Sequence, residues 1–260
     1  AWFDRWLNED EPDLAGKSSA SDPRVQYFLM GENRWLATDE WPPANVDYTS
    51  LYLRQGTGRS AKSLNKGHLT FEAPNTDEAP DHFDYDPAEP VIGHHDSAPT
   101  TELDQRLREG QMLTYTSTSL EGPLTVVGPI SAVLYASTSA PDTDWVVRLC
   151  DVDPSGHSTR ICDGILRARY RYSEVDEALL EPGQVYRFEI DMTATAITFL
   201  PGHRIRIHVT SSDFPRYDRN LNTAEPFGVG DQGRAARNTI FHDAAQPSHV
   251  ILPIVRELSP

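Results

Sequence analysis

The sequence predicts an all-β protein built as a sandwich or jelly roll. About ten short runs rich in β-branched and aromatic residues recur between residues 25 and 255. Turn-forming residues separate these runs, and the 260 residues include 16 Gly and 20 Pro. The runs do not alternate with amphipathic helices, as the βαβ units of a parallel sheet require. Hydrophobic residues make up 38% of the chain, which is enough to fill one large core.

The predicted strands follow one another along most of the chain. They span residues 25–30, 48–53, 68–71, 112–116, 130–136, 145–152, 160–172, 185–190, 205–210 and 249–255. The run 204–210 alternates apolar and polar residues with the period of a strand that has one buried face. The residues expected to face the core are Ile205, Ile207 and Val209. The residues expected to face water are Arg204, Arg206 and His208.

The first 23 residues predict a separate segment. Trp2, Phe3, Trp6 and Leu7 have the spacing of a single apolar helix face, which must be buried against something. Residues 15–23 are small and polar, as in a linker. We therefore expect a helix and linker at 1–23, followed by the β domain at 24–260.

Residues 72–109 predict a long acidic loop. They contain eleven acidic residues, two basic residues and five prolines. We interpret the segment as a solvated excursion from the sandwich. A calcium-binding loop is the alternative, but the prolines interrupt the ligand spacing that such a loop needs.

The charge balance argues against two classes of partner. The chain has 39 acidic and 23 basic residues, a net charge of −16, which repels nucleic-acid phosphates and anionic membrane surfaces. It contains no run of roughly 20 apolar residues, the length needed to cross a bilayer, and its first residues do not resemble an export signal. We therefore expect no nucleic acid and no membrane as partners, and a cytoplasmic location.

No motif in the chain supplies a reaction centre. The glycine patterns at 56–61 and 228–233 lack the strand and helix that dinucleotide binding requires. The three Gly-x-Ser sequences lack the second glycine of a nucleophile elbow. The local cluster Gly93-His-His-Asp96 is interpreted as a solvated loop, with weak metal binding as the alternative, because its proline-rich surroundings do not provide the rigid support that metal ligands need. We therefore expect no catalytic residue, no metal and no cofactor.

Three groups of residues have two open interpretations. Cys150 and Cys162 flank a turn, whose length decides whether they face opposite sides as free thiols or lie opposite one another and form a disulfide. The acidic pairs Asp142/Asp144 and Asp151/Asp153 are interpreted as turn caps, with a structural calcium as the alternative. Four arginines in a loop-rich stretch either anchor a partner or satisfy the chain's own polar atoms. These are Arg216, Arg219, Arg234 and Arg237.

Three strings, taken together, resemble a known family. They are Met30-Gly-Glu-Asn-Arg-Trp35 with Glu40-Trp-Pro-Pro43, Asp142-Thr-Asp-Trp145 with its continuation to residue 171, and Leu200-Pro-Gly-His-Arg204 with its continuation to Asn220. In this order they resemble the C-terminal part of the cocaine esterase/Xaa-Pro dipeptidyl-peptidase-like (CocE/NonD) serine hydrolases. The resemblance spans nearly the whole chain. It implies a galactose-binding-like jelly roll that packs against an α/β-hydrolase domain, whose last helix corresponds to residues 2–7.

The resemblance also implies roles for particular residues. The Ser-His-Asp triad would lie upstream, so this chain is expected to be a non-catalytic piece of a longer hydrolase that cleaves small esters or amides. Leu134 and Tyr135 match an apolar pair that the jelly roll contributes to the acyl pocket. Trp2, Phe3 and Trp6 match the interface with the hydrolase domain.

A stand-alone carbohydrate-binding module is the rival prediction, because the same architecture binds sugars. An apolar N-terminal helix distinguishes the two, since such a module has no use for it.

Overall fold

The structure, a computed structural model, confirms the predicted all-β sandwich. It describes residues 24–63, 65–93, 104–226 and 228–256. In these residues the strands form a two-stranded hairpin and one continuous sheet of eleven strands. The helical elements described there are short 3-10 turns, and no helix among them is long and apolar enough to cross a membrane.

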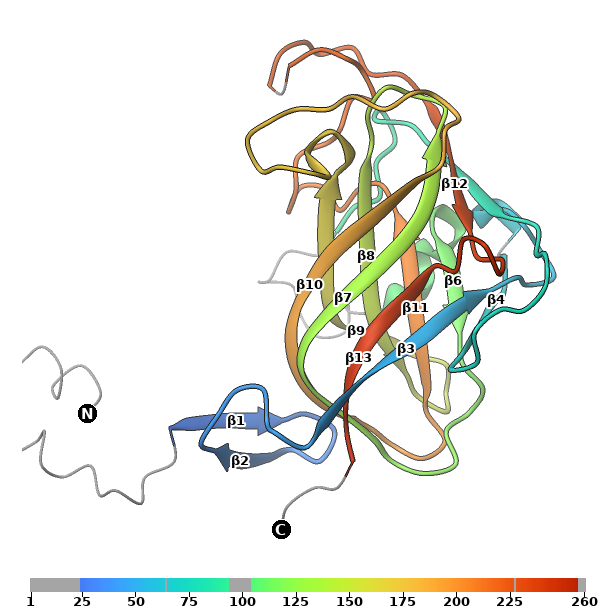
Figure 1. Ribbon diagram of the computed structural model, residues 1–260. Helices are drawn as coiled ribbons and strands as arrows, with labels where there is room; N and C mark the ends of the chain where they lie inside the picture. The colour runs from blue at the N-terminus through green and yellow to red at the C-terminus, as the bar shows by residue number, and fades with distance from the viewer. Residues whose placement is uncertain (1–23, 64, 94–103, 227, 257–260) are drawn as a thin grey trace, which may run out of the picture.

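The eleven-stranded sheet folds over into two layers (Figure 1). The front layer contains β10 (Tyr186–Phe199), β7 (Leu124–Thr138), β12 (Ala236–Phe241), β5 (Asp81–Tyr85), β13 (His249–Val255), β3 (Val46–Arg54) and β4 (Gly67–Thr70). The back layer contains β6 (Leu113–Thr116), β11 (Arg204–Thr210), β8 (Asp144–Val152) and β9 (Ser158–Arg167). The layers join where β4 pairs in parallel with β6, at Gly67 with Tyr115 and at His68 with Thr116.

The hydrophobic core lies between the two layers. Alternate residues of each strand point into it, as the two-residue period of a strand requires. Trp145 of β8 has no exposed surface, and its indole packs against the rings of Phe83 and Phe188 from the front layer. Centroid separations of 6.5 Å and 5.5 Å place these rings in ordinary aromatic contact. Trp145 therefore ties the two layers together.

Each of the ten predicted runs coincides with a strand, and three further strands were not predicted. The three are β2 (Arg34–Thr38), β5 and β12. In addition, β10 continues to Phe199, well beyond the predicted end at residue 190. The run predicted to continue to residue 172 ends at Arg167, where a 3-10 turn, η4 (Ala168–Tyr170), begins.

The prediction of a solvated loop over 72–109 is wrong for residues 81–85. These residues form β5, which pairs with β12, and Asp81, Phe83 and Tyr85 are buried. Asp81 is tolerated there because its carboxylate accepts a hydrogen bond from Asn65 (3.0 Å) and lies 3.4 Å from Nε2 of His242. Because Asp81 occupies one of the inward positions, the sequence of this strand does not show the regular apolar alternation that predicts a strand.

The prediction of a water-facing side for β11 also fails at His208. A 3-10 helix, η3 (Gln105–Gln111), covers this side of the strand. His208 is completely buried, and its Nε2 lies 3.1 Å from a carboxylate oxygen of Glu109. Burial lowers the pKa of His208, while the hydrogen bond with Glu109 opposes that shift. The alternation predicted the inward residues correctly, but it could not reveal this second covering layer.

Both cysteines are free and buried. A bulge shifts the register between β8 and β9, so that Cys162 lies opposite Leu149 while Cys150 lies opposite Arg160. The two thiols therefore point to opposite faces of the layer. This agrees with the free-thiol alternative.

We expect both thiols to be unreactive in the folded chain. Burial raises the pKa of Cys150 and of Cys162 to about 12, which leaves about one thiol in 10,000 ionised at pH 8. A chromogenic disulfide reagent at pH 8 should titrate almost no thiol in the native chain and two thiols after unfolding in guanidinium chloride. Rapid reaction of the native chain would contradict the burial of these residues.

A hairpin of β1 (Val25–Leu29) and β2 projects from one end of the sandwich (Figure 1). Backbone hydrogen bonds join Met30 to Ala196 and Thr198 of β10, and Leu29 is buried against the same strand. The opposite side of the hairpin carries Phe28 in edge-to-face contact with Trp35, which is 70% exposed. The hairpin thus presents aromatic surface beside the front layer.

Candidate functional site

Leu134 and Tyr135 lie on β7, in the middle of the front layer. Leu134 has no exposed surface and belongs to the core, opposite Phe188 of β10. Tyr135, the next residue, points to the outer face and is partly exposed, because neighbouring residues of a strand face opposite sides. Of the two residues matched to the acyl pocket, Tyr135 alone reaches the surface, while Leu134 packs beneath it.

The outer face around Tyr135 carries aromatic and aliphatic side chains together with the polar residues Ser50 and Ser131, which lie on either side of Ile251. We call it the Tyr135 face and define it by outward residues of β7, β13 and β3. These residues are Tyr48, Tyr52, Val133, Tyr135, His249 and Ile251. Tyr48 is 54% exposed and, with Val133 and Ile251, lines a shallow depression. An antiparallel sheet that faces water normally carries polar residues on that side.

Charged residues of β10 border the Tyr135 face on one side. Arg187 lies opposite Tyr135 in the β7–β10 pairing and forms an ion pair with Glu189. Both of these side chains are largely exposed. The face therefore combines an apolar centre with a charged rim, which is the usual anatomy of a protein–protein contact.

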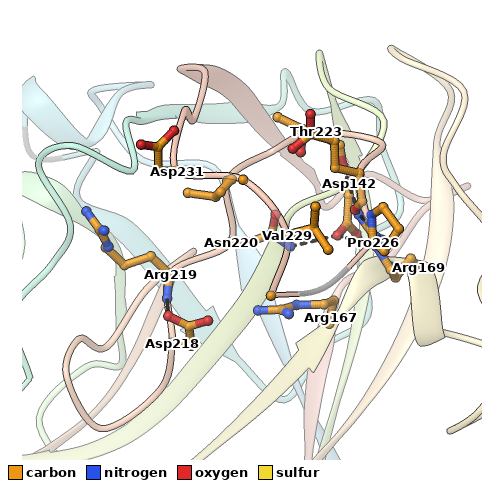
Figure 2. Close-up of a pocket in the computed structure, with 14 residues that line it drawn as sticks. Asp142, Arg167, Arg169, Asp218, Arg219, Asn220, Thr223, Pro226, Val229 and Asp231 are labelled. Carbon is orange, nitrogen blue, oxygen red and sulfur yellow. Dashed lines mark hydrogen bonds and ion pairs between the residues drawn. The ribbon is translucent and has the colours of Figure 1, made fainter.

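A second, polar pocket of about 280 Å³ lies at one end of the sandwich (Figure 2). Its lining includes Asp142, Arg167, Arg169, Asp218, Arg219 and Asn220. A loop that follows β11 contributes both Asp218 and Val229 to it. The pocket thus joins the start of β8 and the end of β9 to this loop.

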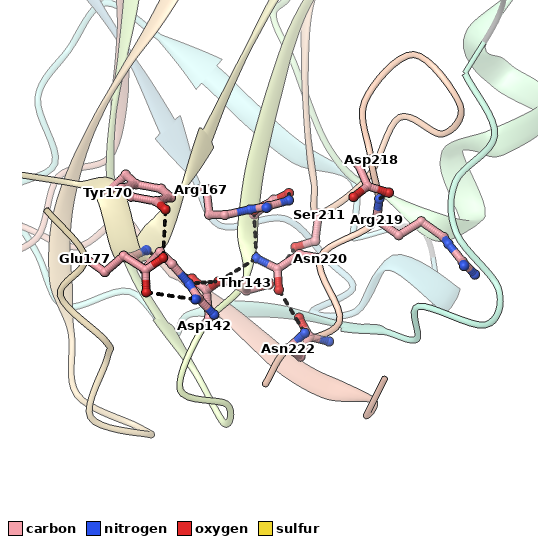
Figure 3. Close-up of polar contacts among 12 residues, drawn as sticks. Asp142, Thr143, Arg167, Tyr170, Glu177, Ser211, Asp218, Arg219, Asn220 and Asn222 are labelled. Carbon is pink, nitrogen blue, oxygen red and sulfur yellow. Dashed lines mark hydrogen bonds and ion pairs between the residues drawn. The ribbon is translucent and has the colours of Figure 1, made fainter. Parts of the chain in front are cut away.

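Buried ion pairs form the floor of the polar pocket (Figure 3). Asp142 accepts hydrogen bonds from Nε and the backbone N–H of Arg169, and from the side-chain amide of Asn220. Asp144 accepts two bonds from Arg167, and burial raises its pKa while this arginine opposes the shift. Side-chain and backbone donors of the chain itself therefore occupy the oxygens that a calcium ion would need.

The acidic pairs were thus only partly interpreted correctly. Asp153 is a turn cap, because its carboxylate accepts the backbone N–H of His157. Asp142 and Asp144 are chiefly partners of arginines instead, and Asp151 contacts His203 at 2.9 Å. Across the described ranges, no group of three or more His, Cys, Asp or Glu side chains is arranged to hold a metal.

The four arginines of the loop-rich stretch contact acceptors of their own chain. Arg216 pairs with Asp163, and Arg237 pairs with Asp84. The guanidinium groups of Arg219 and Arg234 donate to backbone carbonyls. These contacts favour the interpretation that they satisfy internal polar atoms.

The predicted interface residues Trp2, Phe3 and Trp6 lie outside the described residues, as do His94, His95 and Asp96. Sequence reasoning also missed the depression lined by Tyr48, Val133 and Ile251, which lies further along the same outer face and does not include Tyr135. The apolar outward positions of β3 and β13 were a usable signal, because one-sided strands place polar residues there.

Comparisons with known proteins relate the chain to hydrolases. The sequence model of the X-Pro dipeptidyl-peptidase C-terminal non-catalytic domain matches residues 18–251. The chain is 39% identical to a cocaine esterase of Rhodococcus sp. (strain MB1 Bresler), over 98% of its own length and 45% of the relative's.

Two solved structures share both the fold and the sequence pattern. One is an aminopeptidase from a marine sediment archaeon (Thaumarchaeota archaeon), with 33% identity, a TM-score of 0.81, and coverage of 98% of this chain and 44% of that one. The other is an α-amino acid ester hydrolase, with 31% identity, a TM-score of 0.81, and coverage of 97% and 43%. The chain spans less than half the length of each relative it matches here.

Proposed function

The chain belongs to the family of X-Pro dipeptidyl-peptidase C-terminal non-catalytic domains, as the C-terminal domain of a CocE/NonD hydrolase, and we propose that it forms a wall of that enzyme's acyl pocket. Its partner in this proposal is an upstream α/β-hydrolase domain of the same protein. The substrate is a small ester or amide, in keeping with the names of the relatives, an esterase, an ester hydrolase and an aminopeptidase.

The observation that carries the proposal is the Tyr135 face. Its apolar centre is suited to burial against a second domain, and its charged rim is suited to the edge of such an interface. In the proposed enzyme an upstream serine attacks the carbonyl carbon of the substrate, the ester or amide bond breaks with release of the alcohol or amine, and water then hydrolyses the resulting acyl-enzyme to release the acid. The ring of Tyr135 would contact the acyl group and exclude water from it.

The polar pocket gives no support to the rival carbohydrate-binding function. The described residues that line it are charged, small or aliphatic, and none of them offers an aromatic ring on which a sugar could stack.

We expect Tyr135→Ala in the full-length enzyme to weaken the use of substrates with bulky acyl groups and to spare those with small ones. The KM for an ester with a bulky aromatic acyl group should rise about tenfold, because the substrate loses roughly 1.4 kcal/mol of apolar contact. Steady-state kinetics should show little change for the corresponding acetyl ester, which is too small to reach the ring.

Tyr172→Ala is the matched control, because Tyr172 is an exposed tyrosine on the loop between β9 and β10. It should leave both esters unaffected. Equal losses on both esters for Tyr135→Ala, or no loss on either, would refute the proposed pocket role.

A further inference from the structure

Strand β7 changes its neighbour beside Tyr135. Along one edge it pairs with β10, and this pairing is continuous through Leu134 and Tyr135. Along the other edge, β13 pairs with β7 as far as Val133, which lies opposite His249. From Tyr135 onward the partner is β12, with Tyr135 opposite Phe241. The ladder on this edge is therefore interrupted next to the residue proposed to contact substrate.

Ser248 fills this interruption. It immediately precedes β13 and is completely buried. Its Oγ accepts a hydrogen bond from the backbone N–H of Tyr135 (2.9 Å) and donates one to the backbone carbonyl of Phe241 (2.5 Å). Its own carbonyl accepts the backbone N–H of Leu53 in β3 (3.0 Å). One residue thus links β7, β12 and β3.

The hydroxyl performs a task that an apolar side chain cannot. It must accept from one backbone group and donate to another at the same time, and a serine oxygen can do both. Alanine at this position would leave a buried N–H and a buried carbonyl without these partners, which costs stability unless the strands move to pair them. The displacement would be centred on Tyr135, since its N–H is one of the two groups released.

We propose that Ser248 is a positioning residue, whose hydroxyl fixes the backbone of Tyr135 and thereby sets which acyl groups the pocket admits. The inference rests on the proposed function, because it assigns Ser248 a role through Tyr135. Ser248 itself touches no substrate, since it lies beneath the surface.

The test is a double-mutant cycle in the full-length enzyme, with the bulky aromatic ester and the acetyl ester as substrates. Ser248→Ala should raise the KM for the bulky ester about fivefold, the value of one typical hydrogen bond, and change the kcat for the acetyl ester less than about twofold. In the Tyr135→Ala background the same substitution should have no acyl-selective effect, because the ring that it positions is gone. A purely structural role would lower both activities in both backgrounds.

Ser139→Ala is the control, since Ser139 also accepts a backbone N–H, that of Arg237, just beyond the far end of the β7–β12 pairing. It should behave as the wild type does. Equal effects of Ser248→Ala on both esters, or wild-type behaviour, would overturn the inference.

Two further comparisons separate the possible failures. If Ser248→Ala does not fold, Ser248→Cys provides the same measurement with a weaker donor and acceptor, and it is judged by the same criteria. If Tyr135→Ala is selective but the Ser248 variant is not, only this inference fails. If Tyr135→Ala is itself not selective, the proposed function fails.

Discussion

Asp142→Ala is expected to lower the free energy of unfolding of the chain by about 3–5 kcal/mol, the range found when one partner of a buried ion pair is removed. Asp142 is 1% exposed, and it accepts two bonds from Arg169 and one from Asn220. Removal of the carboxylate leaves the buried guanidinium of Arg169 with Glu177 as its remaining ionic partner. Urea denaturation followed by tryptophan fluorescence measures this loss.

Arg237→Ala is the control for this prediction. Arg237 pairs with Asp84 on the surface, where the two side chains are 60% and 45% exposed. Solvent screens such a pair, so the substitution should change stability by less than about 1 kcal/mol. A loss for Asp142→Ala as small as that of the control would show that the Asp142–Arg169 contact does not hold the floor of the polar pocket together.

Trp145→Ala is expected to destabilise the chain by a similar amount, about 3–5 kcal/mol. The reason differs, because this substitution removes a fully buried indole and leaves a cavity between the layers, beside Phe83 and Phe188. The midpoint of thermal unfolding, read by circular dichroism, should fall accordingly.

Trp145→Phe distinguishes the effect of the lost volume from the effect of the lost indole N–H. Among the described residues, Nε1 of Trp145 has no hydrogen-bond partner, so the substitution removes an unsatisfied buried donor together with part of the ring volume. We expect a loss well below that of Trp145→Ala. Equal losses for the two variants would mean that the filling of this space does not dominate the contribution of Trp145.

The sequence predicted strands where apolar alternation is regular and missed them where polar side chains are buried. β12 illustrates the reason. Its inward positions should all be apolar, but one of them is Asn238, which is completely buried. Its side-chain amide donates to hydroxyls of Thr143 and Ser211, which come from other parts of the chain. A residue stabilised by such partners cannot be recognised as buried before the fold is known.

The candidate site shows the same limit. The resemblance supplied Leu134 and Tyr135, and the period of a strand separates them into one buried and one surface residue. The ion pairs of the polar pocket could not be predicted, because Arg169 and Asn220 lie 27 and 78 residues from Asp142 in sequence. Their approach is a product of the three-dimensional fold.

The parallel contact between β4 and β6 has a consequence for how the chain assembles. Gly67 and His68 can pair with Tyr115 and Thr116 only after the long loop between them has closed. We therefore expect the β4–β6 pairing to form late in folding. Until this pairing forms, β4 and β6 each have an unpaired edge, and such edges can pair with the edge strands of other molecules. The net charge of −16 opposes such encounters by mutual repulsion. The negative charge of the chain is thereby expected to oppose its self-association during synthesis.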